Sequence, residues 1–263
     1  MLVGIIQTTS TFFTDIVAYA IKKRTYDMKK TLIVLTLNEI DGIKELYDKI
    51  PFEAADEVVA VDGGSTDGTR EFLDEKGLRV LEQEIKGRGE AFRVALRKTK
   101  GDVLLYFSPD GNEDPEDIPL LFAKIEDGCD IAIASRFMRG SRNEEDDHFF
   151  RWRAWVNQSF TYTANLLWNT KDYVHDTING YRAVRRDVFK RLNTDEQKFP
   201  IEYQMSIRAM KLKLNIGEIP TIEGNRIGGE SKAESFPVGW GHVNVFLHEL
   251  FNGKEWERET TIT

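Results

Sequence analysis

Apolar, β-branched runs alternate with segments of helical periodicity through the first half of the chain. The apolar runs, which the pattern predicts to be strands, fall at residues 31–37, 56–62, 78–83, 102–110 and 130–135. The segments with apolar positions three and four apart, which it predicts to be helices, fall at residues 40–51, 69–77, 89–101 and 115–128. The first run, TLIVLTL, is a continuous apolar and β-branched run, as expected of a strand buried on both faces of a sheet.

Strands that alternate with helices over short links are typical of a parallel, doubly wound α/β sheet. We therefore predict a Rossmann-like, mostly parallel sheet with helices on both faces. In such sheets, ligands bind beyond the carboxyl ends of the strands. The pattern predicts one α/β domain over residues 29–235, with an N-terminal extension at 1–28 and an amphipathic helix and tail at 236–263.

Three aromatic and apolar segments raise the question of membrane contact. Residues 1–28 combine an apolar body with a basic end, and they suit either a surface helix or an interfacial membrane contact. They lack the basic start and the small-residue cleavage site of a secretory signal. Residues 150–168 and 236–251 repeat aromatic and apolar positions at helical spacing, so each could pack on the body or face lipid.

Charge and cysteine content argue against several classes of function. Lys and Arg total 36 and Asp and Glu total 44, and the resulting net charge of −8 argues against a general nucleic-acid binder. The single cysteine, Cys129, permits neither an intrachain disulfide nor a cysteine metal cluster. We therefore expect a reducing, cytoplasmic location, with peripheral contact at the cytoplasmic membrane face left open.

The stretch VDGGSTDGT follows the second predicted strand and supplies the first candidate binding groups. Asp62 ends the strand, and Gly63 and Gly64 turn the chain tightly. Ser65 and the polar residues after it can cap the next helix. The stretch fits either a capped strand-to-helix turn or a nucleotide pocket in which Asp62 accepts hydrogen bonds from a base or ribose. The chain has neither G-x-G-x-x-G after the first strand nor G-x-x-x-x-G-K-[ST], so dinucleotide and P-loop sites lose their usual support.

Oxygen-rich side chains also follow the fourth predicted strand, in the stretch SPDGNEDPED. Asp110 stands at the strand tip, and a carboxylate there can bind a divalent cation that bridges to a diphosphate. Asn112 adds an amide oxygen to the same loop. Glu113 and Asp114 instead suit the acidic first turn of the next helix, where the helix dipole stabilises them.

These motifs, taken in order, resemble family 2 glycosyltransferases of the GT-A fold. TLNE, VDGGSTDGT, KGRGEA and SPDGNEDPED follow the first four predicted strands. Four later motifs, ASRFMRG, HDTINGYR, PIEYQMSIRAMKLKLNIGEIP and NRIGGESK, are similar to the dolichyl-phosphate mannose synthase branch. The resemblance covers residues 31–235. Each motif alone is unspecific, and the strength of the resemblance lies in their shared order and spacing.

The resemblance implies a role for each matching position. The positions that would bind the nucleotide sugar or the acceptor phosphate are Thr36, Asn38, Glu39, Asp62, Gly64, Ser65, Lys86, Arg88, Arg136, Arg226, Ser231 and Lys232. The positions that would be catalytic are Asp110, Asp176 and Arg182. Asp110 and Asn112 would also hold a divalent cation, Mg²⁺ or Mn²⁺, against the diphosphate.

The chain departs from the family pattern in its acids. Ser108 stands where the first acid of Asp-x-Asp is usual, and Gly63 replaces the second acid of the usual D-D-G-S. Asn112 stands where a glutamine is usual. Because the site has fewer carboxylates, we expect it to bind a divalent cation more weakly than the family pattern implies. The same loss leaves a non-catalytic, nucleotide-sugar-binding protein as an alternative.

The resemblance implies an enzyme that transfers a hexose, with inversion, from a nucleotide-diphosphate sugar of GDP-mannose or UDP-glucose type to a polyprenyl phosphate such as dolichyl phosphate. Such an acceptor is already anionic, so it needs cations rather than a strong general base. Arg136, Arg182 and Arg226 lie inside the motifs and could supply them. Transfer to a soluble phosphorylated molecule or a glycan is the alternative. The sequence leaves the base, the sugar and the oligomeric state open.

Overall fold

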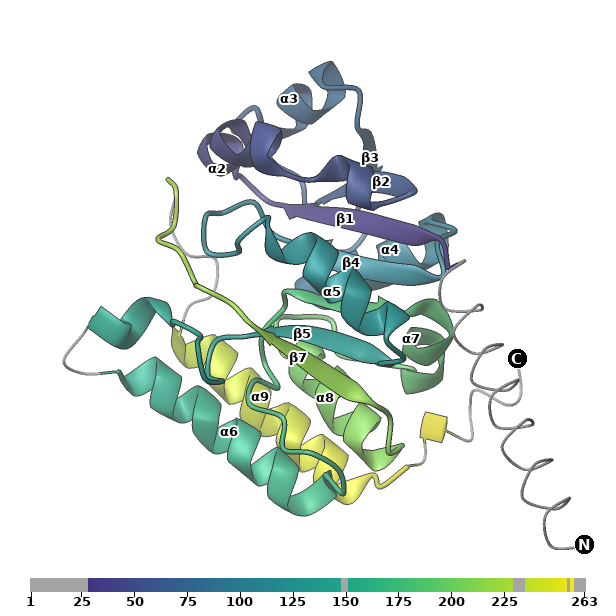
Figure 1. Ribbon diagram of the computed structural model, residues 1–263, viewed down its shortest axis with the longest axis vertical. Coiled ribbons are helices and arrows are strands. Elements are labelled where there is room, and N and C mark those ends of the chain that lie inside the picture. The colour runs from purple at the N-terminus through teal and green to yellow at the C-terminus, as the bar shows by residue number, and fades with distance from the viewer. Residues whose placement is uncertain (1–27, 148–150, 229–234, 255, 258–263) are drawn as a thin grey trace, which may run out of the picture.

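The computed structural model describes residues 28–147, 151–228, 235–254, 256 and 257, which form one sheet with helices on both of its faces (Figure 1). The strands run in the order β3-β2-β1-β4-β6-β5-β7 across the sheet. Their bounds are β1 Lys30–Thr36, β2 Glu57–Asp62, β3 Arg79–Glu82, β4 Val103–Phe107, β5 Ile131–Ser135, β6 Arg182–Arg185 and β7 Ile216–Pro220. The predicted class, a mostly parallel α/β sheet, is confirmed.

The first five strands lie where the sequence pattern predicts them, with tighter bounds. β4 ends at Phe107, so the acidic stretch after it forms a loop rather than the end of the strand. β6 and β7 are not predicted by the pattern. β6 has only four residues, and arginines at both of its ends, Arg182 and Arg185, leave no apolar run to detect.

β6 gives the sheet its one change of direction. It pairs antiparallel with both β4 and β5, whereas the other neighbouring strands pair in parallel. β4 and β5 are therefore not neighbours, although they follow one another among the predicted strands. Because β6 runs antiparallel to β4, residues that follow β4 lie near residues that precede β6.

The helices connect the strands and cover the sheet. Their bounds are α2 Ile40–Leu46, α3 Thr69–Glu75, α4 Arg88–Lys98, α5 Asp117–Glu126, α6 Trp152–Trp168, α7 Arg186–Leu192, α8 Ile201–Lys211 and α9 Ser235–Phe251. Short 3₁₀ turns lie at Tyr47–Lys49, Phe52–Ala54 and Glu144–Asp147. The helix predicted over 40–51 thus ends as an α-helix at Leu46 and continues as a 3₁₀ turn.

Alternate residues of β1 enter two separate cores, one on each face of the sheet. Ile33 and Leu35 belong to the core shared with α4, α7 and α8. Leu32 and Val34 belong to the core shared with α2, α3 and α5. Because both faces are covered, residues 32–35 of the strand are apolar at every position rather than at every second one.

α6 and α9 lie side by side at one end of the molecule and pack on α8 (Figure 1). Phe160 of α6 stacks near His242 of α9 at a ring distance of 5.4 Å, and Trp168 contacts Phe246 at 5.6 Å. Among the residues that the structure describes, no helix combines the length and apolarity needed to cross a bilayer. The extension predicted at 1–28 falls outside the described residues except for its last position, and the predicted domain bounds stay a prediction.

Candidate active site

A cavity of about 540 Å³ lies at the carboxyl edge of the sheet, a size suited to a small-molecule ligand. Its wall combines the tips of β1 and β2, the loops after β3 and β4, and residues of α6, α8 and α9. Of the predicted site residues, the cavity is lined by Thr36, Glu39, Lys86, Arg88, Asp110, Asn112, Arg136 and Arg226. Parallel strands thus bring most of the predicted groups to one place.

Asp62 adjoins this cavity but does not line it. Its carboxylate accepts hydrogen bonds from the Thr36 hydroxyl at 3.1 Å and the Ser65 hydroxyl at 2.5 Å. It also accepts from the backbone amides of Gly64 and Ser65, each at 2.9 Å. With its oxygens engaged by four protein donors, Asp62 holds the loop after β2 and orients Thr36, which does face the cavity.

The loops after β1 and β2 are tied to one another. The Asn38 amide donates to the Ser65 hydroxyl at 2.8 Å, and the Asn38 side-chain oxygen accepts from the Thr66 amide at 2.8 Å. Asn38, Gly64 and Ser65 do not line the cavity. These predicted binding residues therefore build the support of the cavity wall, while Thr36 and Glu39 form its surface.

Arg226 bridges Asp110 and Glu39, two acids that line the cavity. Its Nη1 donates to Asp110 Oδ2 at 2.8 Å, and its Nη2 pairs with Glu39 Oε1. Its Nε is buried and has no hydrogen-bond partner among the described residues. Arg226 is 116 residues from Asp110 in sequence, so the fold rather than a local motif creates this group. The other predicted residues of this segment, Ser231 and Lys232, lie outside the described residues.

Glu113 lines the cavity, and its interpretation as a residue of the first helical turn is wrong. α5 begins only at Asp117. The preceding loop turns Glu113 back toward the end of β4, where its carboxylate accepts a hydrogen bond from the Ser108 amide at 2.6 Å. Burial raises the pKa of Glu113 well above its usual value, Arg88 opposes that rise, and Asp110 adds to it. A second carboxylate thus stands beside Asp110 although Ser108 replaces the usual acid.

The oxygen ligands around Asp110 suit a divalent cation in kind. Asp110 Oδ1 accepts a hydrogen bond from the backbone amide of Asn112 at 3.1 Å. The side-chain nitrogen of Asn112 donates to Glu144 at 3.1 Å. This leaves the side-chain oxygen of Asn112 as the atom that can bind a cation. Within the described part of the chain, no three acid or histidine ligand atoms converge at this cavity. Asp110 and Asn112 are therefore the residues of this loop whose oxygens could hold a divalent cation.

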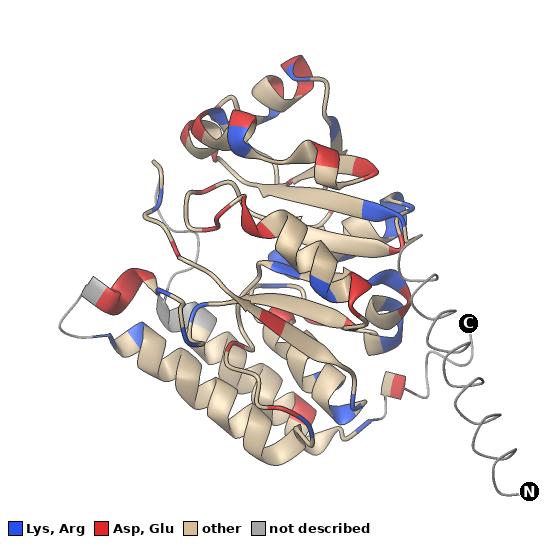
Figure 2. Ribbon diagram, in the orientation of Figure 1, with Lys and Arg blue, Asp and Glu red and all other residues tan. Residues whose placement is uncertain are grey.

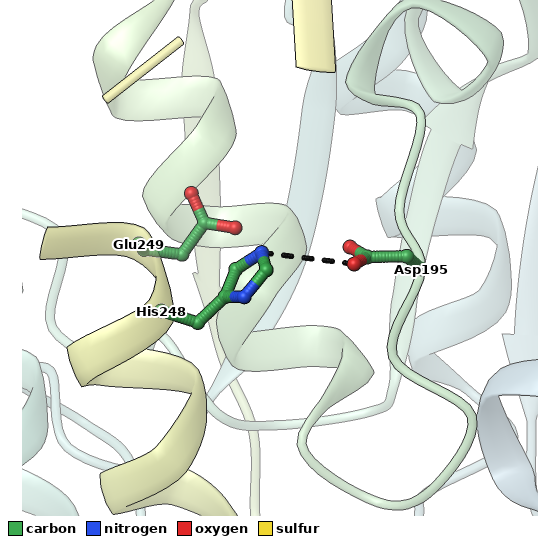
Figure 3. Close-up of side chains that lie close together, drawn as sticks. All are labelled: Asp195, His248 and Glu249. Atoms are coloured by element: carbon green, nitrogen blue, oxygen red, sulfur yellow. Dashed lines mark ion pairs between the residues drawn. The ribbon is translucent and has the colours of Figure 1, made fainter. Parts of the chain in front are cut away.

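Three such ligand atoms do converge elsewhere, at Asp195, His248 and Glu249 (Figure 3). His248 Nε2 lies 3.6 Å from Asp195 Oδ2. The Glu249 carboxylate is already paired with Arg208 and Lys211, each at 2.7 Å. Because protein cations neutralise these acids, the cluster fastens α9 to α8 rather than offering a metal site.

Arg88, the first residue of α4, links that helix to α8 across the cavity. Its Nε pairs with Glu202 Oε1, and its Nη1 donates to the Ser108 hydroxyl at 3.3 Å. Glu202 lines the cavity, and its Oε2 is buried with no hydrogen-bond partner among the described residues. Glu202 is not among the site residues predicted from the sequence. Acidic residues are common at the start of helices, where the helix dipole favours them, so this glutamate carries no signal of a binding site.

Asp176 and Arg136 form a buried ion pair beside the cavity. Arg136 donates to Asp176 from Nε at 2.7 Å, from Nη2 at 3.1 Å and from its backbone amide at 3.2 Å. Glu223 lies 3.5 Å from the Arg136 Nη1. Burial alone would raise the pKa of Asp176, but Arg136 holds it below its usual value. Asp176 is fully buried and does not line the cavity.

Arg182 is also fully buried and does not line the cavity. It donates to the carbonyl of Asn179 at 2.8 Å, to that of Glu202 at 3.0 Å and to the Ser206 hydroxyl at 3.2 Å. Burial lowers the pKa of Arg182 to about 10. Arg182 therefore anchors the first turn of α8 to β6, and with it the Glu202 side chain.

We expect Gly87→Ala to destabilise the cavity wall. Gly87 has φ +145°, a conformation that residues with a side chain rarely adopt, and a Cβ there would overlap the carbonyl oxygen of Gln197. The expected loss is about 1–3 kcal/mol in the free energy of unfolding, measured by urea denaturation. Gly77→Ala is the matched control, because a Cβ at Gly77 meets no atom within 4 Å although its φ is +76°. Equal losses in the two variants would contradict the overlap with Gln197 as the cause.

The fold and the cavity define the class of the protein, an α/β protein whose strand-edge cavity is lined by carboxylates and guanidinium groups. The chain belongs to glycosyl transferase family 2, whose family model matches residues 31–192. The match begins at β1 and ends at α7. Three elements lie beyond the match: α8, which carries Glu202; β7, which Arg226 follows; and α9.

Two relatives have names that concern the acceptor. Dolichol-phosphate mannosyltransferase from Pyrococcus furiosus is 26% identical over 240 residues, which cover 88% of this chain and 65% of that protein. The chain thus spans less than two thirds of that relative's length. Dolichyl-phosphate hexose transferase from Haloferax volcanii is 31% identical over 197 residues, which cover 73% of this chain and 82% of that protein. These matches confirm the predicted family and its dolichyl-phosphate mannose synthase-like branch.

A solved structure shares the fold. Glucosyl-3-phosphoglycerate synthase from Mycobacterium tuberculosis, in complex with Mn²⁺, UDP and phosphoglyceric acid, superposes with a TM-score of 0.66 at 20% sequence identity. The superposition covers 88% of this chain and 80% of that one. At this identity the likeness concerns the fold, and it confirms the predicted GT-A architecture.

Proposed function

We propose that this protein is a glycosyltransferase that moves a hexose from a nucleotide-diphosphate sugar to a polyprenyl phosphate, with inversion at the anomeric carbon. The observation that carries the proposal is a single cavity that extends from the strand tips to the apolar helices. Thr36 at the end of β1, Asp110 after β4 and Phe160 of α6 all line it. Such a cavity suits a polar donor at one end and a lipid-linked acceptor at the other.

The donor is expected to lie across the strand tips. Thr36 and Glu39 would contact the nucleoside, with Asn38, Asp62, Gly64 and Ser65 as the support behind them. Lys86, Arg88 and Arg226 would neutralise the diphosphate, and the unpaired Nε of Arg226 is a donor for one of its oxygens. The cations lower the energy of the negative charge that gathers on the leaving diphosphate as the sugar departs.

A divalent cation such as Mg²⁺ or Mn²⁺ fits beside Asp110 and Asn112, which would be its protein ligands. When bound, it would supply further neutralisation of the leaving diphosphate. Arg226 already pairs with Asp110 at 2.8 Å, so it would share this task with the cation. We therefore expect metal to strengthen donor binding while Arg226 carries part of the charge.

The acceptor phosphate would approach from the side of α6. A phosphate monoester is already anionic and attacks without a strong general base, so the site must mainly hold it against the repulsion of the donor. Arg153 of α6 lines the cavity, and Ser231 and Lys232 follow Arg226 in the chain. Asp176 and Arg182 would act indirectly. Asp176 would hold Arg136 in place, and Arg182 would hold the first turn of α8.

The outer faces of α6 and α9 support a membrane-bound acceptor. Each helix has 17 residues with a single charged one, Arg153 in α6 and Glu249 in α9, and most of both ribbons is uncharged (Figure 2). The exposed apolar side chains are Trp152, Trp155, Val156, Tyr162, Leu166 and Leu167 of α6, and Trp240, Leu247, Leu250 and Phe251 of α9. Aromatic and aliphatic groups in this number suit burial in the interfacial zone of a bilayer.

A soluble phosphorylated acceptor is the second candidate. The crystal structure that shares this fold is of a synthase bound to phosphoglyceric acid. The apolar faces of α6 and α9 favour the lipid-linked acceptor, because a water-soluble acceptor gives no reason to expose them. The third candidate is a protein that binds the nucleotide sugar without transferring the hexose, and an assay must distinguish it from the two transferases.

Transfer from labelled donors tests the proposal. The full chain, with Mn²⁺, is incubated with GDP-mannose or UDP-glucose and with either polyprenyl phosphate in vesicles or 3-phosphoglycerate in solution. We expect label in the organic phase with one of the donors. Label on 3-phosphoglycerate, separated from unreacted donor by anion-exchange chromatography, with none in the organic phase would support the second candidate against the first. Donor binding without transfer to either acceptor would contradict the proposed activity.

The membrane face makes a separate prediction. Trp240 and Phe251 are 62% and 79% exposed, and we expect the double replacement Trp240→Ser and Phe251→Ser to weaken binding to phosphatidylcholine–phosphatidylglycerol vesicles by about tenfold or more. Co-sedimentation measures the bound fraction. Leu120→Ser on α5 is the matched control, because Leu120 is comparably exposed but lies on another part of the surface. If the double variant binds vesicles as well as the wild type does, lipid does not cover this face. If the wild type is a dimer in solution and the double variant is a monomer, a second copy of the chain covers this face instead of lipid.

A further inference from the structure

A second hollow, of about 490 Å³, lies at the amino end of β4, whereas the candidate active site lies at the carboxyl edge of the sheet. It is lined by the end of α4, the loop that leads into β4, and α7, through Leu96, Arg97, Thr99, Lys100, Arg186 and Lys190. We call these six residues the basic hollow. Four of them are Lys or Arg and none is acidic, although acids outnumber bases by 44 to 36 in the whole chain. The basic hollow is therefore a local concentration of positive charge on an acidic protein.

The antiparallel strand β6 brings the two sides of the basic hollow together. Because β6 runs against β4, its last residue, Arg185, pairs with Val103, the first residue of β4. The next amide, that of Arg186, donates to the carbonyl of Asp102 at 2.8 Å. α7 begins at Arg186, so its first turn lies against the chain that leaves α4. The fold, rather than a local run of bases, thus gathers these cations.

Arg186 is held in one orientation by the end of α4. Its Nε and Nη1 donate to the carbonyls of Gly101 and Leu96. Its Nη2 donates to the Thr99 hydroxyl at 2.7 Å, and that hydroxyl donates to the Ala95 carbonyl at 2.7 Å. The described residues thus use three of the five N–H donors of the guanidinium group, and two remain for another acceptor.

The cations of the basic hollow lack acidic partners, with one exception. Within the described residues, Arg186, Lys100 and Lys190 form no ion pair. Arg97 does, with Glu90. Burial lowers the pKa of Arg186, because it disfavours the charged form of a group that no carboxylate contacts in the described part of the chain. A bound anion would offset this cost and would neutralise the lysines as well.

We propose that the basic hollow binds a small anion that carries two or more phosphate groups. The inference goes beyond the proposed function, because none of the six residues lines the cavity of the candidate active site. The remaining N–H groups of Arg186 suit the oxygens of one phosphate, since a guanidinium group binds phosphate with two parallel hydrogen bonds. Lys100 and Lys190 add two further charges for a second phosphate. A free polyphosphate and a lipid headgroup with two phosphates share this chemistry.

Calorimetric titration of the full chain with inorganic tripolyphosphate, in EDTA and at low salt, tests the free ligand. We expect Lys100→Gln combined with Lys190→Gln to weaken the binding by about tenfold or more. Lys44→Gln combined with Lys98→Gln is the matched control, because it removes two exposed lysines that do not line the basic hollow. Arg226→Gln is titrated alongside, because tripolyphosphate could also enter the candidate active site. Both of these variants should bind the anion as tightly as the wild type does.

A second arm of the experiment tests a lipid source. The full chain is sedimented with phosphatidylcholine vesicles that contain or lack cardiolipin, whose headgroup carries two phosphates. If cardiolipin increases binding of the wild type but not of the Lys100 and Lys190 double variant, and tripolyphosphate does not bind, the proposal holds with a lipid headgroup as the ligand. If tripolyphosphate binds and the double variant weakens it, the proposal holds with a soluble ligand.

Four results would overturn the proposal. The first is a wild type that responds to neither probe, and the second is a double variant that matches the wild type with both. The third is an equal loss in the Lys44 and Lys98 control, because the effect would then come from overall charge. The fourth is a loss of anion binding in Arg226→Gln alone, which would place the anion in the candidate active site. None of these results bears on hexose transfer, so the proposed function is tested separately.

Discussion

Replacing Asp176 by alanine is expected to lower the free energy of unfolding by about 3–5 kcal/mol, because the change leaves the Arg136 guanidinium buried without its main partner. Arg136 donates three hydrogen bonds to Asp176, the shortest at 2.7 Å, and Asp176 is fully buried. Urea denaturation followed by circular dichroism measures the loss. Asp172→Ala is the matched control, since Asp172 is an exposed acid in the same loop. If Asp176→Ala and Asp172→Ala both lower the free energy of unfolding only slightly, the ion pair does not have the role proposed for it.

The same pair predicts a pH dependence of stability. Arg136 holds the pKa of Asp176 below its usual value, so ionised Asp176 stabilises the folded state. This contribution is fully present above the usual aspartate pKa of about 3.9, and it disappears as the pH falls through the lower pKa of the folded state. The difference in unfolding free energy between wild type and Asp176→Ala should therefore be constant near neutral pH and shrink in acid.

Replacing Asp110 by asparagine is expected to reduce kcat/KM for hexose transfer by about 100-fold or more. The change removes the charge that pairs with Arg226 at 2.8 Å and the carboxylate that would hold the cation, while the size of the side chain stays the same. Transfer to polyprenyl phosphate is measured over a range of Mn²⁺ concentrations. We expect excess Mn²⁺ to restore little of the lost rate.

Asp114→Asn provides the control for the loss of an acid from the same loop. Asp114 accepts a hydrogen bond from the Glu116 amide at 3.0 Å ahead of α5 and does not line the cavity. This variant should keep the wild-type rate. Loss of activity in both variants would point to the folding of the loop rather than to Asp110. Full activity of Asp110→Asn would remove Asp110 from the mechanism.

The part of the fold that could be predicted is the part whose sequence pattern is local. Residues 32–35 of β1 are apolar at every position because both faces of the sheet are covered, and this pattern is visible in the run itself. β6 has four residues, two of them arginines, and its place between β4 and β5 depends on antiparallel pairing with strands far away in sequence. Such a strand is specified by tertiary contacts, which no local periodicity records.

The candidate site divides in the same way. Thr36, Asp110 and Lys86 line the cavity because each follows a parallel strand, and the ends of such strands meet at one edge. The contacts that complete the site join residues more than 100 positions apart, such as Arg88 with Glu202. Sequence spacing carries no signal for these pairs. The resemblance supplied the positions of Asp176 and Arg182, but the structure was needed to find both buried behind the cavity wall.

A crystal structure of the full chain with the transferring nucleotide sugar and Mn²⁺ tests the central claim most directly. We predict the nucleoside at Thr36 and the diphosphate between Asp110 and Arg226, with the anomalous signal of manganese within reach of Asp110. A donor bound elsewhere on the molecule, with Asp110 still paired only to Arg226, would contradict the account.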